Sequence, residues 1–262
     1  MSARSESDAP PDAALLKAAP CSVYGFEPDI EEWEKLNKAK KDGQHFLPYA
    51  VGDGSTQTFH ECTFPATSSI FEPNTALLAK FQFLEELTRV TRSYRVETRR
   101  LDDIAEIAGA DFLKADVQGA ELLVFRGAIE TLRSVLVVHT EVIFVPLYKH
   151  QPLFGDVDCF LRAQGFQFHR LIGTAGRTFK PLTFNNNPAA GMSQMLWGNA
   201  VYVRDFLDFD QLAPDALLKL AVILHENYGA ADLAAVVLES YDRQIGSSLQ
   251  PAYIARLINP AP

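Results

Sequence analysis

The chain has 262 residues, of which 47% are hydrophobic and 22% are charged. This composition is that of an ordinary globular protein with enough apolar side chains for a sizeable core. The formal net charge of -9 argues against nucleic acid as the main partner, because binding to a phosphate backbone usually depends on clustered Lys and Arg.

Three cysteines, Cys21, Cys62 and Cys159, lie far apart and show none of the Cys/His spacings of a zinc site. We expect them to be thiols in a reducing compartment, and we assign no metal site. No apolar run approaches the length of a membrane span, and residues 1–12 are polar where a signal peptide needs an apolar segment. The expected location is therefore the cytoplasm, without membrane contact.

The first predicted strand ends at an acidic residue. Residues 1–12 have no periodicity and are expected to be disordered, and residues 13–19 form one short helix. Residues 22–26 are a strand followed by Glu27, and residues 30–41 are a helix. An acid at the end of the second strand of a nucleotide-binding sheet can accept hydrogen bonds from both ribose hydroxyls. The alternative is a helix N-cap or a surface carboxylate.

The next part of the chain alternates strands, loops and helices. Its predicted elements are a strand at 45–51, a turn at 52–55 that starts a hairpin into 56–61, a loop at 63–74, a helix at 75–91, an edge strand at 95–98 and a helix at 101–108. Loops as long as the one at 63–74 often close over ligands. Ala50 and Val51 are expected to rim the same crevice as Glu27.

The rest of the chain is organised around residues 110–127. A short apolar run at 111–115 is typical of a buried parallel strand, and Asp116 stands at its carboxyl end, where open α/β sheets bind ligands. Gly119 allows a tight turn, and Glu121 lies in the first turn of the following helix. Glu121 has two equally weighted interpretations, which are a charge that complements the helix dipole and a catalytic group.

A second buried strand at 134–141 ends at His139, Thr140 and Glu141. Further predicted elements are a helix at 129–133, a loop at 146–155, a helix at 157–163, and strands at 166–171 and 200–204. The insert at 174–198 is rich in Asn, Gly, Pro and aromatic residues. It is expected to shape a substrate pocket, and a surface loop is the alternative.

From Pro214 onward the pattern is helical, with helices expected at 215–226, 230–244 and 251–257. An apolar stripe on the first of these predicts a small bundle that packs on the main domain or on a second subunit. A homo-oligomer formed through this extension is therefore an open alternative. His225 lies beside the stripe and is assigned a structural role.

Several of these stretches together resemble the FkbM family of S-adenosylmethionine-dependent methyltransferases. They are residues 23–29, residues 50–53 with Ser68 and Ser69, residues 112–121, and Glu141 followed by residues 146–148 and 151–154. The most specific piece is the Asp-Val-Gln-Gly-Ala-Glu run that begins at Asp116. The resemblance implies a Rossmann-like α/β sheet with helices on both faces. We place this methyltransferase domain at residues 13–209, and the helical pattern after it predicts an extension at 210–262.

The resemblance also implies transfer of a methyl group to a hydroxyl of a sugar or a natural-product-like small molecule. Glu27, flanked by Phe26 and Pro28, would hold the ribose of S-adenosylmethionine, and Ala50 with Val51 would lie by the adenine. The residues for the methyl-transfer centre follow from the same resemblance. Asp116 would border that centre, and the candidates for the base that takes the acceptor's proton are Asp116, Glu121, His139 and Glu141.

One family feature is missing from the sequence. Such methyltransferases open with a strand and a glycine-rich turn that approaches the cofactor's methionine end, and no such motif precedes Val23. The strands that end at Glu27 and Asp116 must therefore pair directly or leave a gap of one strand. This departure supports a rival hypothesis, a catalytically inactive module that binds a glycan or a protein. A nicotinamide-dependent enzyme is a third, weaker alternative.

Overall fold

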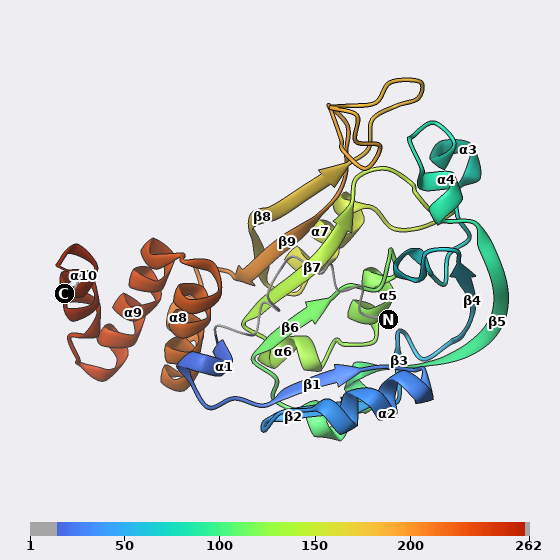
Figure 1. Ribbon diagram of the computed structural model, residues 1–262. Helices are drawn as coiled ribbons and strands as arrows, with labels where there is room; N and C mark the ends of the chain where they lie inside the picture. Colours follow the sequence, from blue (N-terminus) through green and yellow to red (C-terminus); the bar gives the residue numbers. More distant parts are fainter. Residues whose placement is uncertain (1–14, 260–262) are drawn as a thin grey trace.

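The computed structural model describes residues 15–259 and shows a mixed α/β protein with three small sheets followed by helices (Figure 1). The expected disorder of residues 1–12 lies outside the described residues. The short predicted helix is present as α1 (Leu15–Ala18).

The first sheet contains two parallel strands, β1 (Val23–Phe26) and β2 (Gln44–Leu47), joined by α2 (Ile30–Ala39). Asp29 caps α2 by accepting the Glu32 N–H at 3.0 Å. The indole N–H of Trp33 donates to the Phe46 carbonyl at 2.8 Å and fixes α2 against β2. The predicted strand at 45–51 is wrong as one element, because it is divided at Pro48 into β2 and β3.

The second sheet has the order β3-β5-β4, with β3 (Ala50–Val51), β4 (Thr56–Cys62) and β5 (Val90–Arg99). The predicted hairpin between 45–51 and 56–61 is wrong, since β5 lies between β3 and β4 and pairs with both. The predicted edge strand at 95–98 is likewise wrong, because it belongs to a central strand of ten residues.

Between β4 and β5, the predicted helix at 75–91 is reduced to two single turns, α3 (Thr75–Leu78) and α4 (Leu84–Leu87). Phe81 between them is buried and stacks on Phe179, and Phe83 has a left-handed backbone with φ of 62°. The predicted helix at 101–108 also fails to form and is replaced by two short 3-10 turns. Tertiary contacts therefore override local helical periodicity in both segments.

The third and largest sheet has the order β6-β7-β9-β8. Its strands are β6 (Phe112–Ala115), β7 (Val137–Ile143), β8 (Phe166–Gly176) and β9 (Met195–Arg204). β6 and β7 are parallel, whereas β9 is antiparallel to both β7 and β8. The helical segments α5 (Glu121–Arg126), α6 (Thr131–Ser134) and α7 (Phe154–Ala163) contribute to the main core over one face of this sheet.

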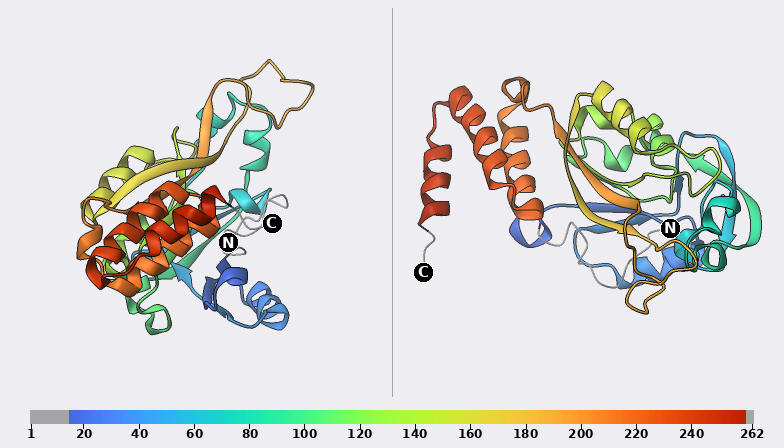
Figure 2. Two further views of the ribbon diagram at one scale, coloured as in Figure 1. Left: turned by 90° about the vertical axis from the view of Figure 1, so that its left-hand side faces the viewer. Right: turned by 90° about the horizontal axis from the view of Figure 1, so that it is seen from above.

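The predicted C-terminal helices are present as α8 (Pro214–Tyr228), α9 (Ala231–Ile245) and α10 (Leu249–Ile258). Side chains of α8 and α9 form a second core with apolar residues of β7 and β9. α9 and α10 extend away from the sheets beyond α8 (Figure 2). Within residues 15–259, no helix is long and apolar enough to cross a membrane.

The strands that end before Glu27 and Asp116 do not pair with each other. Among the described residues, β1 pairs with β2 alone and β6 with β7 alone. Of the two arrangements expected from the sequence, the structure therefore shows unpaired neighbouring edges rather than direct pairing. A close backbone crossing instead joins the second sheet to α5, where a Cβ on Gly127 would lie 2.0 Å from the Gly52 carbonyl oxygen.

Candidate active site

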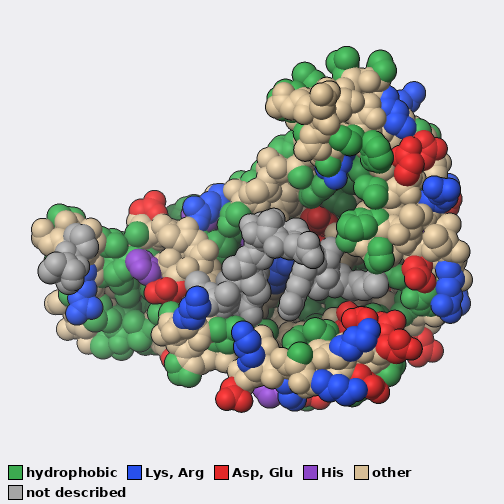
Figure 3. Space-filling view, in the orientation of Figure 1, with side chains coloured by type: hydrophobic (Ala, Val, Ile, Leu, Met, Phe, Trp, Pro, Cys, Tyr) green, Lys and Arg blue, Asp and Glu red, His purple; other side chains and the backbone are tan. Residues whose placement is uncertain are grey.

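Polar side chains gather on one face of β6 and β7 near the carboxyl end of β6. The register aligns Lys114 with His139 and Ala115 with Thr140, so that Asp116 follows beside Glu141. Figure 3 shows a hollow on this side of the molecule with acidic side chains inside it. One turn connects three acidic residues that are up to 25 positions apart in the sequence, Asp116, Glu121 and Glu141.

Gln118 joins two of these carboxyl groups. Its Nε2 donates to Asp116 Oδ1 at 3.1 Å and to Glu141 Oε2 at 3.0 Å. Its backbone has φ of 54°, a left-handed conformation that costs a non-glycine residue about 1 kcal/mol or more. The sequence indicates Gln118 only as part of the Asp-Val-Gln-Gly run, because a contact with a residue 23 positions away leaves no local pattern.

Glu121 holds the turn between β6 and α5. Its Oε1 accepts the backbone N–H groups of Val117 at 2.8 Å and Gly119 at 3.3 Å. The side chain is buried, and this burial raises its pKa to about 7, with the charge of Asp116 acting in the same direction. The predicted position of Glu121 in the first turn of α5 is confirmed, and its carboxyl group serves the turn as well as the helix dipole.

The pKa of Glu141 is also raised. Burial raises its pKa well above the usual range, and the nearby charges of Asp116 and Glu121 raise it further. Lys114 opposes this effect, since its ammonium lies 3.6 Å from Asp116 Oδ2. The side chain of Asp116 is 18% exposed, and Glu141 is also only partly buried, whereas Glu121 is buried.

His139 lies in the interior of β7, and not at the strand end that the sequence predicted. β7 continues to Ile143 because β9 pairs with it along its whole length. Nδ1 of His139 is 3.2 Å from the hydroxyl of Tyr228 on α8. Burial, together with the positive charge of Lys114, lowers the pKa of His139 to about 4. The imidazole is therefore neutral near pH 7 and points toward the helical extension.

Two loops meet the turn that carries Gln118. Ser69 Oγ donates to the Gln118 carbonyl at 2.7 Å, which fixes the loop at 63–74 against the turn. The hydroxyl of Tyr148 donates to the Thr67 carbonyl at 2.8 Å, and the Tyr148 backbone N–H donates to Gln151 Oε1 at 2.5 Å. The sequence indicated both loops but assigned their polar residues no partners.

The proposed ribose ligand Glu27 lies directly after β1 and is buried. Its Oε1 accepts the Asp29 N–H at 3.0 Å, and its Oε2 accepts no hydrogen bond within the described part of the chain. Phe26 packs against the main core, and Pro28 follows at the start of α2. An acceptor oxygen is thus left available at the carboxyl end of β1.

Ala50 and Val51 form β3 and pair with Thr98 and Arg99 of β5. The Gly127 crossing described above places the turn after β3 against the last turn of α5, whereas Asp116 and Glu121 lie at its first turn. Six helical residues separate these two ends by about 9 Å. The structure therefore brings the proposed catalytic carboxylates together, but places β3 at a distance from them.

The insert at 174–198 forms the long connection between β8 and β9, partly as an extension of both strands. Gln82 Nε2 donates to the Leu182 carbonyl at 2.8 Å and holds the connection near α3 and α4. The apolar side chains of the insert are largely exposed, among them Leu182 (61%) and Met192 (59%).

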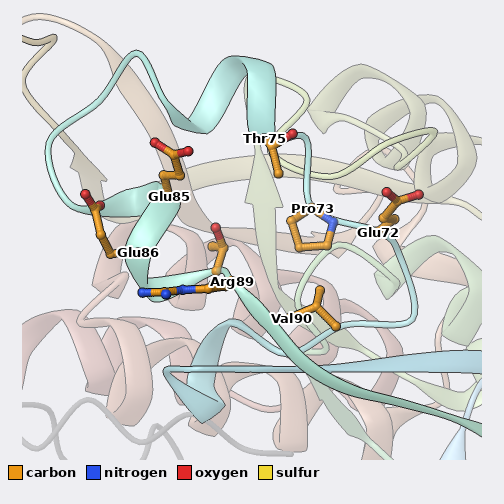
Figure 4. Close-up of a pocket in the computed structure, with 8 residues that line it drawn as sticks. Glu72, Pro73, Thr75, Glu85, Glu86, Arg89 and Val90 are labelled. Carbon is orange, nitrogen blue, oxygen red and sulfur yellow. The ribbon is translucent and has the colours of Figure 1, made fainter.

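A separate surface hollow of about 530 Å³ lies beside α4 and the start of β5 (Figure 4). Its lining includes three glutamates and one arginine, and it contains none of the residues around Gln118: Glu72, Pro73, Thr75, Glu85, Glu86, Thr88, Arg89 and Val90. Glu72 is paired with Lys149 at 2.6 Å. Within residues 15–259, no group of three or more His, Cys, Asp or Glu side chains is arranged to hold a metal ion.

Comparison with known families gives the family of the chain. The methyltransferase FkbM domain matches residues 6–168, which is more than half of the chain. The chain belongs to the FkbM methyltransferase family. The carboxylates of β6, β7 and α5 all lie within the matched segment, and α8 to α10 lie beyond it. Comparisons with curated proteins and with solved structures gave no match.

Proposed function

We propose that this FkbM-family protein is an S-adenosylmethionine-dependent O-methyltransferase that acts on a hydroxyl of a sugar or a natural-product-like small molecule. The observation that carries the proposal is the group of Asp116, Gln118 and Glu141 at the carboxyl end of β6. When bound, the cofactor supplies an electrophilic methyl group, and the protein's task is to align the acceptor oxygen with it and to remove the hydroxyl proton.

Asp116 is our choice for the group that takes this proton. Glu121 accepts two backbone N–H groups within the turn, and His139 faces Tyr228. Glu141 is half-buried and has a raised pKa, so that it tends to hold its proton. Asp116 combines partial exposure with two stabilising neighbours, the Gln118 amide and the Lys114 ammonium. These neighbours hold its carboxylate in one orientation for an incoming hydroxyl.

The cofactor-binding proposal assigns Glu27 to the ribose and the segment at Ala50 and Val51 to the adenine. Glu27 fits this role because its Oε2 is free of hydrogen bonds within the described residues and lies at the carboxyl end of a strand. We further propose that the β2-β1 pair and the β6-β7-β9-β8 sheet are two parts of one Rossmann-like arrangement. This proposal is supported by the acidic residue that follows one strand of each parallel pair, Glu27 after β1 and Asp116 after β6.

A catalytically inactive binding module is the second candidate. It is favoured by the edges of β1 and β6, which within residues 15–259 pair with no further strand. Such a module would act on a glycan or a protein, and a homo-oligomer formed through α8 to α10 is compatible with it. This alternative predicts a folded protein that does not bind the cofactor.

Calorimetric titration with S-adenosylmethionine and S-adenosylhomocysteine separates the two candidates. Saturable binding that Glu27→Ala removes supports the methyltransferase, and no binding by the folded chain supports the inactive module. Asp29→Ala is the matched control, since Asp29 caps α2 but has no proposed cofactor contact. It is expected to cost about 1 kcal/mol of stability and to leave the affinity unchanged.

Replacement of Asp116 by Asn tests the chemistry. Asn keeps the shape and an oxygen for Gln118 but cannot take a proton, so methyl transfer should fall about 100-fold or more while cofactor affinity is retained. Asp111→Asn, just before the start of β6, is the control because Asp111 is partly exposed and pairs with Lys219. Turnover of Asp116→Asn at the wild-type rate would remove Asp116 from the mechanism.

A further inference from the structure

Gln151 is a buried side chain with only one end of its amide satisfied. The residue is 7% exposed, and its Oε1 accepts the Tyr148 backbone N–H. This contact fixes which end of the amide is oxygen, because an N–H donor must meet an acceptor. The opposite end, Nε2, has no hydrogen-bond partner within the described part of the chain.

The free Nε2 lies against the turn that carries the candidate catalytic groups. A Cβ on Gly119 would be 3.1 Å from Gln151 Nε2 and 3.5 Å from the ring of Tyr148. Gly119 has φ of 92°, a backbone conformation that favours glycine, and its lack of a side chain leaves room for this approach. Tyr148 also lies in the field of Glu141 and Glu121, which together with burial raises the pKa of its hydroxyl. Gln151, in the loop at 146–155, therefore lies next to the turn that carries Asp116 and Gln118.

An unpaired amide donor in such a place is costly. Burial of a polar group without a partner costs about 1–3 kcal/mol, and a flip of the amide would set its NH₂ against the Tyr148 N–H. Asp116 contacts Gln118 and Gln151 Nε2 lies against Gly119, so the two groups meet adjacent residues of one turn. An acceptor bound over this turn would take the place of the packing that now covers Nε2.

We propose that Gln151 selects the acceptor, by donating a hydrogen bond from Nε2 to an oxygen next to the hydroxyl that Asp116 deprotonates. The inference rests on the proposed methyltransferase function and deepens it. It identifies the acceptor class as molecules with two neighbouring oxygens, such as the vicinal diols of sugars, in preference to isolated alcohols. A buried donor left unpaired by the wrong acceptor is the physical basis of this selection.

The experiment measures kcat and KM with S-adenosylmethionine for a panel of methyl glycosides and their monodeoxy analogues. The wild type should lose about 10- to 100-fold in kcat/KM for the analogue that lacks the neighbouring oxygen. Gln151→Met, which has a similar length and no amide, should show this loss with the parent glycoside and little further loss with the deoxy analogue. Its affinity for S-adenosylhomocysteine should match the wild type.

Gln167→Met is the matched control, because both ends of the Gln167 amide are satisfied within the protein, by Arg162 and Asp205. It should discriminate between glycoside and deoxy analogue like the wild type. A folded Gln151→Met protein that still discriminates fully would overturn the proposal. If that variant does not fold, the deoxy series on the wild type decides, and indifference to every deoxy analogue overturns it.

A failure of the proposed function gives a different result. If no glycoside is methylated although S-adenosylhomocysteine binds, saturation-transfer NMR measures glycoside binding directly. Binding to the wild type that Gln151→Met loses supports the acceptor site without activity. Equal binding by both proteins, or binding by neither, contradicts it.

Discussion

One face of β7 changes in character along its length, and the two halves are governed by different physical chemistry. Val137 at the start of the strand packs in the core formed with α8, where Leu217 and Leu220 are fully buried. Glu141, four residues later on the same face, receives a hydrogen bond from Gln118 and lies beside Asp116. His139 stands between them and contacts the last residue of α8, Tyr228.

The comparison shows which half of β7 is stabilised by burial and which half is not. The half of the strand under α8 gains stability from apolar burial. The other half holds a buried and a half-buried carboxyl group, Glu121 and Glu141, whose raised pKa values show that their charged forms are disfavoured. Burial of titratable groups without a full set of partners is typical of functional sites. The apolar half therefore serves stability, and the polar half is the one we assign to the reaction.

The largest expected effect comes from the apolar half. Leu217→Ala should lower the free energy of unfolding by about 2–5 kcal/mol, because the leucine is fully buried between α8 and the sheet. Denaturant unfolding followed by circular dichroism measures this loss. Val222→Ala on the same helix is the control, since Val222 is 38% exposed and its truncation should cost less than about 1 kcal/mol. A change in cofactor affinity of folded Leu217→Ala protein would show that the two halves are not independent.

In the polar half, we expect Glu121 to make a pH-dependent contribution of up to about 3 kcal/mol to the free energy of unfolding. Its pKa is raised from 4.5 to about 7 in the folded protein, so the folded state retains a proton that the unfolded chain releases. This contribution to stability is complete below pH 4.5 and is lost as pH rises through 7. Glu121→Gln keeps an oxygen for the Val117 and Gly119 N–H groups but cannot ionise. The variant should be more stable than the wild type at pH 8 and close to it at pH 4.

Comparison with the wild type at each pH is essential, because His139 acts in the opposite direction. Its pKa is lowered from 6.5 to about 4, so its contribution is present above pH 6.5 and is lost as pH falls through 4. The two groups offset each other between about pH 4.5 and 6.5 in the wild type. Glu121→Gln should remove one of the two raised carboxyl groups that oppose His139, the other being Glu141, so that stability falls less steeply with rising pH than in the wild type. A stability difference that is constant from pH 4 to 8 would contradict the assignment.

The smallest expected effect lies at the boundary between the halves. Tyr228→Phe removes the hydroxyl that is 3.2 Å from His139 Nδ1 and should cost about 1 kcal/mol of stability. Tyr241→Phe is the control, because Tyr241 packs in the same core and its hydroxyl has no hydrogen bond within residues 15–259. Thermal unfolding of both variants measures the difference. Equal stability of the two would show that the contact with His139 does not hold α8 to the sheet.

Several features were readable from local sequence. Apolar runs at 22–26 and 111–115 gave two strands with acidic residues at their carboxyl ends, and the stripe after Pro214 gave the C-terminal helices. The place of Glu121 at the start of α5 followed from Gly119 and the Asp-Val-Gln-Gly run. These features depend on periodicity and turn chemistry within about ten residues, which a single sequence displays directly.

Only the tertiary structure decided which residues contact each other across the sheets. Gln118 meets Glu141 because β6 and β7 are parallel neighbours, and β7 extends past His139 because β9 pairs with it. β5 replaces part of a predicted helix because it pairs on both sides with other strands. Contacts between residues so far apart in the chain leave no local pattern, and their hydrogen bonds override weak helical propensity. The sequence by itself thus determined which acidic residues follow the strands, and long-range strand pairing decided which of them meet.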